Sequence, residues 1–147
     1  MRPGCSILTA TISRSFIKAK LIFIVLNGIQ YALPLLTKRG ASVIVNTPSS
    51  SVWMGEPEHV AYQQAQKGLV GLTWHTAPLG GKHDVRCNLV APGFTRTEAA
   101  FMNTNEEYRN QMLASLRSSC LGAAEDIAAM VAFLFSDGAS KTPNDSS

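Results

Sequence analysis

Two short runs of apolar and β-branched residues predict strands on either side of a helical segment. The runs are SVIVN at 42–46 and VRCNLVA at 85–91. The continuous apolar character of the first run is typical of a strand buried on both faces of a parallel sheet. Between them, residues from about 58 to 77 predict a helix, which Pro78 and the Gly80-Gly81 pair are expected to end. The apolar positions of that helix are Val60, Leu69, Val70, Leu72 and Thr73. The simplest topology for this order of elements is a strand, a helix and a second strand that runs parallel to the first.

The flanking segments predict further elements of an α/β fold. ALPLLTKRG reads as a helix ending at Gly40, with basic residues at its negative end. LIFIVL at 21–26 is either a buried strand or the start of a buried helix, because periodicity does not separate the two. Two helices are predicted near 104–117 and 123–135. The apolar positions expected to line one side of the latter are Ile127, Met130, Val131, Leu134 and Phe135.

Length and composition predict one globular domain. The chain has 147 residues, of which 46% are hydrophobic, enough to bury a single core. We expect an atypical, disordered N-terminus at 1–20, a domain at 21–140 and a disordered polar tail at 141–147. The apolar run from Leu21 to Leu36 is interrupted by polar residues and Pro34, so no transmembrane helix is expected.

The net charge and the cysteines indicate which kinds of partner the protein binds and in which cellular compartment it lies. A net charge of +3 is too small to argue for a nucleic-acid partner. The charge is unevenly placed, since the first acidic residue is Glu56 and the N-terminal third is basic. Three cysteines without a metal or disulfide spacing favour reduced thiols and a cytoplasmic location. The acid-free basic N-terminus leaves mitochondrial targeting as the alternative.

Several motifs occur together between Val43 and Thr97. Ser49 precedes Tyr62 by thirteen residues, LVGLT follows at 69–73, and NLVAPGFTRT occupies 88–97. Together these motifs resemble the catalytic half of the short-chain dehydrogenases/reductases. The resemblance covers roughly residues 25–140. It implies an α/β fold with part of a doubly wound, Rossmann-like parallel sheet, and an NAD- or NADP-dependent oxidoreductase acting on a small-molecule alcohol or ketone.

The resemblance also implies roles for individual residues. Tyr62 would be the catalytic acid/base, and Ser49 would orient and polarise the substrate oxygen. The cofactor-binding positions would be Gln66, Pro92, Gly93, Thr95 and Thr97. An asparagine that supports a proton-relay water in the family is either Asn27 or has been replaced by Val25, depending on where a gap falls.

One departure from the family pattern concerns the catalytic lysine. Tyrosines ordinarily titrate near 10, so a nearby positive charge is needed to make one a usable base at neutral pH. The family places that charge four residues after the tyrosine, where this chain has Gln66, and a lysine follows one step late at Lys67. On a helix, position i+4 lies roughly 40° from the tyrosine and i+5 roughly 140° away. Proton transfer is therefore expected to be impaired.

A second departure concerns the cofactor's diphosphate. A dinucleotide-binding fold opens with a strand, a Gly-rich turn and a helix, but the glycines before residue 55 are Gly4, Gly28 and Gly40, isolated from one another. We therefore expect a truncated member without the N-terminal nucleotide-binding half. Two functions stay open: an impaired oxidoreductase, or a catalytically silent relative that acts by association with other subunits. The family's dimer surface implies association through helices 24–38 and 58–77.

No metal site is expected. His59, His75 and His83 lie too far apart in the sequence to form a local ligand pair, and His83 with Cys87 lacks further ligands. Glu125 and Asp126 open a predicted helix, where negative charge favours the positive dipole end. A structural role is sufficient for these two carboxylates.

Overall fold

The protein forms two compact units that meet in the sequence at Ala91 and Pro92, and each is described by itself. The computed structural model describes residues 5–54, 60–116 and 119–140, with side chains from Lys20 onward. The predicted tail at 141–147 and His59 lie outside the described residues. The domain limits expected at residues 20 and 140 stay predictions.

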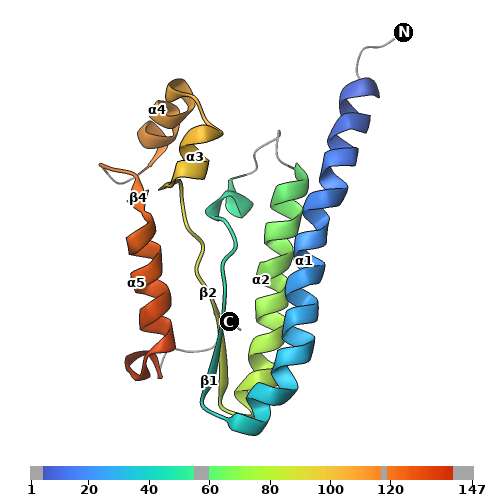
Figure 1. Ribbon diagram of the computed structural model, residues 1–147, viewed down its shortest axis with the longest axis vertical. Coiled ribbons are helices and arrows are strands. Elements are labelled where there is room, and N and C mark those ends of the chain that lie inside the picture. The colour runs from blue at the N-terminus through green and yellow to red at the C-terminus, as the bar shows by residue number, and fades with distance from the viewer. Residues whose placement is uncertain (1–4, 55–59, 117–118, 141–147) are drawn as a thin grey trace. The chain divides into compact units, whose positions relative to one another are not determined.

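The first unit is a strand–helix–strand motif with an additional helix. Its elements are α1 (Cys5–Arg39), β1 (Ser42–Asn46), the 3₁₀ helix η1 (Ser50–Trp53), α2 (Val60–Gly81) and β2 (Val85–Leu89). β1 and β2 pair in parallel, from Ser42 opposite Val85 to Asn46 opposite Leu89. In Figure 1, α2 lies between these strands and α1. The predicted α/β class and the parallel topology are confirmed.

The buried face of α2 forms the core against the sheet. Its buried residues recur at helical spacing and are Ala65, Leu69, Val70, Thr73, Thr76, Ala77 and Gly80. Within this core, Asn46 Nδ2 of β1 donates a hydrogen bond of 2.8 Å to Thr73 Oγ1. Thr73 Oγ1 in turn donates to the Leu69 carbonyl at 2.8 Å, so both buried polar groups are paired. Val60, the first residue of α2, is 48% exposed and lies outside this core.

Helix α2 also runs further than the sequence indicated. Pro78 lies inside the helix, which continues to Gly81. A proline inside a helix leaves the carbonyl of residue i−4 without its usual donor, here that of Trp74. Pro78 and Trp74 are both exposed, so water can solvate the carbonyl and the helix persists.

The ambiguous segment 21–26 is helical and lies within α1. It therefore adds no strand to the sheet. The predicted helix end is close to that observed, since α1 ends at Arg39 and Gly40 follows with a positive φ of 64°. That conformation favours glycine and is a common way to terminate a helix.

Lys20–Arg39 of α1 is long and apolar enough to cross a bilayer by length and composition alone. Core helices of soluble proteins and signal sequences can meet the same criterion, and α1 packs against α2. The expectation that the chain has no membrane partner stays a prediction.

The second unit contains short strands and three helices. Its elements are β3 (Thr95–Arg96), α3 (Glu98–Met102), α4 (Glu106–Ser115), β4 (Gly122–Ala123), α5 (Ala124–Phe135) and the 3₁₀ helix η3 (Asp137–Ala139). β3 and β4 pair in parallel, with Thr95 opposite Gly122. α4 and α5 confirm the two helices predicted near 104–117 and 123–135.

The ends and faces of α5 agree only in part with the sequence prediction. The Ala123 N–H donates to Asp126 Oδ2 at 2.8 Å, which confirms a structural role for this carboxylate at the helix start. Leu134 is buried, and Ile127 and Val131 are half-buried. Met130 and Phe135 are 50% and 56% exposed, so the apolar side of α5 is only partly covered within the second unit.

Candidate functional site

Ser49 lies in the loop after β1, at the carboxyl end of a parallel strand. Ligands of open α/β sheets commonly bind at this end. Ser49 is half-buried and precedes η1, and its Oγ accepts a hydrogen bond of 3.3 Å from the Ser51 N–H. The hydroxyls of Ser49 and Ser51 also lie 3.0 Å apart, close enough for one to donate to the other. The turn therefore holds the Ser49 hydroxyl in a defined position.

Tyr62 and Gln66 lie in the first turns of α2, against which η1 packs. Both side chains are half-buried. Gln66 Oε1 is enclosed, and among the residues that the structure describes it has no hydrogen-bond partner. Buried side-chain oxygens are normally paired with protein or water, so this acceptor fits a donor from outside the described chain.

Lys67 is exposed and contacts a different part of the first unit. Its Nζ lies 5.2 Å from the centre of the Trp53 ring, within the range of a cation–π interaction. The exposed fraction of Trp53 is 57%, so this contact is in water. Of the two neighbouring side chains, Gln66 is the more enclosed and Lys67 the more exposed.

The other predicted cofactor positions belong to the second unit and lie close together there. Pro92, Thr95 and Thr97 line a shallow, mainly apolar hollow of about 440 Å³. The remaining lining residues come from α5 and are Ala124, Ile127, Ala128 and Val131. The sequence did not indicate these four as cofactor positions, although Ile127 and Val131 were expected on one face of the helix and Ala128 has the spacing to join them.

Both threonines of this hollow have local structural partners. Thr95 Oγ1 donates to the Gly93 carbonyl at 3.0 Å. Thr97 Oγ1 accepts from the Ala100 N–H at 3.1 Å and so caps the N-terminus of α3. Pro92, Gly93, Thr95 and Thr97 therefore form one local arrangement, while Ser49, Tyr62 and Gln66 form another in the first unit.

The side chains present fit one end of a nicotinamide dinucleotide better than the other. The enclosed Oε1 of Gln66 is an acceptor that suits a ribose hydroxyl. Among residues 5–54, the described structure before β1 is the single helix α1, without a Gly-rich strand-to-helix turn. Among the described residues, such a fit is found at the nicotinamide end.

Two further predictions concern a metal site and the proton-relay asparagine. Within the described ranges, no three His, Cys, Asp or Glu side chains lie close enough together to hold a metal ion. Asn27, one of the two alternatives for the proton-relay position, is exposed on α1. Its role stays undecided between the two alternatives.

Comparison with known proteins identifies the family. A family model described as enoyl-(acyl carrier protein) reductase matches residues 22–143. The chain belongs to the short-chain dehydrogenase/reductase family. A 7alpha-hydroxysteroid dehydrogenase of Bacteroides fragilis is 37% identical over 110 residues, which are 75% of this chain and 42% of that protein. A levodione reductase of Leifsonia aquatica is 32% identical over 120 residues, which are 77% of this chain and 45% of the relative.

Solved structures of this short-chain dehydrogenase/reductase family share the fold. The crystal structure of a levodione reductase matches with a TM-score of 0.73 and 30% identity, covering 80% of this chain and 48% of that one. A 4-hydroxyisoleucine dehydrogenase complexed with NADH matches with a TM-score of 0.68 and 28% identity, covering 84% and 50%. The chain thus spans about half the length of the proteins it matches.

Proposed function

We propose that this chain carries the reacting-end residues of an NAD- or NADP-dependent oxidoreductase acting on an alcohol or ketone, with impaired turnover. The observation that carries the proposal is the arrangement in the first unit. Ser49 follows a parallel strand, and η1 packs against the helix that bears Tyr62 and Gln66. The family membership and the NADH complex of a structural relative support the same class of reaction.

In this proposal Tyr62 and Ser49 act on the substrate oxygen. The cofactor, when bound, would accept or supply the hydride. Tyr62 would take the proton from an alcohol, or return one to the oxygen of a ketone. Ser49 Oγ accepts from the Ser51 N–H, and with the Ser51 hydroxyl as the donor of the second hydrogen bond its own proton would point to the substrate oxygen. That hydrogen bond would polarise the carbonyl and orient it.

Impairment follows from the residue at position 66. A neutral glutamine provides no positive charge to stabilise a phenolate at Tyr62. Lys67 does not supply the missing positive charge, because its Nζ lies over the Trp53 ring. The hydroxyl of Thr97 and the hollow beside Pro92 and Thr95 are proposed cofactor contacts in the second unit.

The alternative is a catalytically silent relative that acts by association with other subunits. Exposed apolar residues on α2 favour it, since Trp74 and Leu79 are 53% and 49% exposed. Such side chains would suit a surface covered by another subunit. A cytoplasmic location is proposed for either function.

A turnover experiment with matched variants tests the proposal. Reduction of a generic ketone is followed at millimolar NADH and NADPH for the wild-type chain, Tyr62→Phe and Ser49→Ala. We expect slow reduction that falls by about 100-fold or more in Tyr62→Phe, the usual contribution of general acid–base catalysis. Tyr31→Phe, on an exposed tyrosine of α1, is the control and keeps the wild-type rate. Equal rates in Tyr62→Phe and the wild type would overturn the proposal, and no reduction by any form would favour the silent relative.

A further inference from the structure

Lys67 follows Gln66 on α2 and makes a side-chain contact of its own. Its Nζ lies over the ring of Trp53, 5.2 Å from the ring centre. Trp53 is the last residue of η1, whereas Lys67 belongs to α2. The contact therefore joins two elements whose contacting residues are fourteen positions apart in the sequence.

The 3₁₀ helix η1 is a short hydrogen-bonded link between Ser49 and Trp53. The Val52 N–H donates to the Ser49 carbonyl at 3.2 Å. The Met54 N–H, directly after Trp53, donates to the Ser51 carbonyl at 3.0 Å. The Ser51 N–H in turn donates to Ser49 Oγ at 3.3 Å. A displacement of Trp53 is therefore transmitted through these bonds to the Ser49 hydroxyl.

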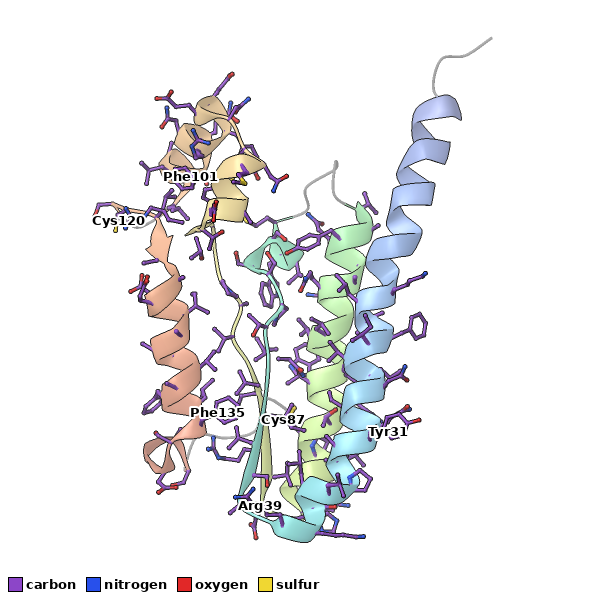
Figure 2. The ribbon with its side chains drawn as sticks, in the orientation of Figure 1. Tyr31, Arg39, Cys87, Phe101, Cys120 and Phe135 are labelled. Carbon is purple, nitrogen blue, oxygen red and sulfur yellow. The ribbon has the colours of Figure 1, made fainter. Side chains whose placement is uncertain are left out.

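The position of η1 depends on its contacts with α2. In Figure 2, η1 lies beyond the end of β1 and beside the N-terminal half of α2. No residue of η1 is buried, and 3₁₀ helices of this length have weak hydrogen-bond geometry of their own. Apolar burial therefore contributes little to holding η1 in place, and a side-chain contact such as that between Lys67 and Trp53 gains importance.

Lys67 and Tyr62 lie on different sides of α2. They are separated by five residues, which corresponds to about 7.5 Å along the helix axis and about 140° around it. Lys67 therefore does not face the phenol of Tyr62. Its connection to the candidate site runs through Trp53 and η1 to Ser49.

We propose that Lys67 is a positioning residue, which holds Trp53 against α2 and so keeps the Ser49 hydroxyl aligned with Tyr62. The ammonium group covers one face of the indole, so η1 loses the cation–π contact when it turns away from α2. This inference rests on the proposed function, because the position of Ser49 matters to the reaction only where Ser49 polarises the substrate oxygen.

Amide hydrogen exchange of the full chain, measured by NMR, tests the contact without turnover. The reporters are the N–H groups of Ser51 and Val52, which both donate to Ser49. We expect Lys67→Met to raise their exchange rates by about 2- to 5-fold, the factor that corresponds to an exposed cation–π contact. Lys67→Arg keeps a cation over the ring and should keep the wild-type rates. Lys82→Met, at an exposed lysine beyond the end of α2, is the matched control and should also keep them.

Replacement of the ring completes a double-mutant cycle. Trp53→Leu should raise the same exchange rates by about as much as Lys67→Met, and the double variant should show no further rise, since both changes remove one contact. Ketone reduction by these variants is the second readout. We expect kcat to fall by about the same factor in Lys67→Met, to be restored in Lys67→Arg, and to keep its pH dependence.

The possible outcomes separate this inference from the proposed function. Wild-type exchange rates in Lys67→Met, an equal rise in Lys67→Arg, or additive effects in the double variant would overturn the inference. A changed pH dependence of kcat in Lys67→Met would also overturn it, because the charge would then act on Tyr62 directly. Absence of ketone reduction in every form would count against the proposed function, while the exchange rates would still decide whether Lys67 holds η1.

Discussion

The side chains of Asn46 and Thr73 form a buried hydrogen bond of 2.8 Å between the end of β1 and the middle of α2. Asn46 is three residues before Ser49, and Thr73 is on the helix that bears Tyr62. The bond therefore links the strand end that precedes one candidate catalytic residue to the helix that carries the other. Its loss is expected to affect both stability and the alignment of the two segments.

Substitution of Thr73 by valine removes the acceptor while keeping the side chain's shape. Asn46 Nδ2 would then be a buried donor without its partner, and we expect the free energy of unfolding to fall by about 1–3 kcal/mol. A double-mutant cycle of Thr73→Val with Asn46→Ala, followed by chemical denaturation, measures the coupling. Strict additivity of the two single effects would contradict the importance of this bond.

Gly80 is expected to tolerate no side chain. A Cβ at Gly80 would lie 2.9 Å from the Val85 carbonyl oxygen and 3.1 Å from Val85 Cβ, at the point where α2 meets β2. Gly80→Ala should therefore destabilise the first unit by about 1–3 kcal/mol, as overpacked cores do. Gly71→Ala is the matched control on the same helix, because a Cβ there has no neighbour within 4 Å.

Thermal unfolding of the two glycine variants separates these expectations. Alanine is the better helix former, so Gly71→Ala should be neutral or stabilising by up to about 1 kcal/mol. Equal stability of Gly80→Ala and Gly71→Ala would show that the helix and strand are less closely packed than described.

The variant Gln66→Lys tests whether the missing lysine alone limits ketone reduction. The new charge would stand four residues from Tyr62, but we expect it not to restore ketone reduction, because the described residues contain no Gly-rich turn for the cofactor's diphosphate. Gln64→Lys, at an exposed position of the same helix, is the control for added charge. A rise in turnover of about 100-fold in Gln66→Lys alone would make the lysine position the only deficit.

Thr97 has a measurable structural role that can be separated from its proposed cofactor contact. Thr97→Ala removes the cap of α3 and should reduce stability by about 1 kcal/mol. Thr97→Asp retains a capping oxygen and should preserve stability, while its negative charge should weaken any NADH binding at this position. If Thr97→Asp leaves cofactor binding unaltered, Thr97 is only a helix cap.

The sequence predicted the first strand and the order of elements well, because local patterns determine both. SVIVN coincides with β1 residue for residue, and β2 begins at Val85 as predicted. The family motifs supplied the candidate roles of Ser49 and Tyr62, which stay predictions. Their geometric relationship required the fold, since it depends on contacts between η1 and α2 that no local pattern records.

Errors arose where a local signal was outweighed by its surroundings. Pro78 predicted a helix end, but its exposed position allows the helix to continue. The sequence leaves residues 21–26 open between a strand and a helix, and the helix is observed because Ile22, Leu26 and Ile29 continue the helical spacing of a face that packs against α2. Which side of α1 is covered could not be predicted, because in a helix with apolar residues on two sides this depends on the neighbouring elements.

Calorimetric titration of the chain with NADH and NADPH tests the central claim most directly. We propose that the chain carries the residues of the reacting end and holds the cofactor mainly at its nicotinamide end. We therefore expect weak binding of both cofactors, with half-saturation in the millimolar range. Saturation at micromolar NADH or NADPH would contradict it.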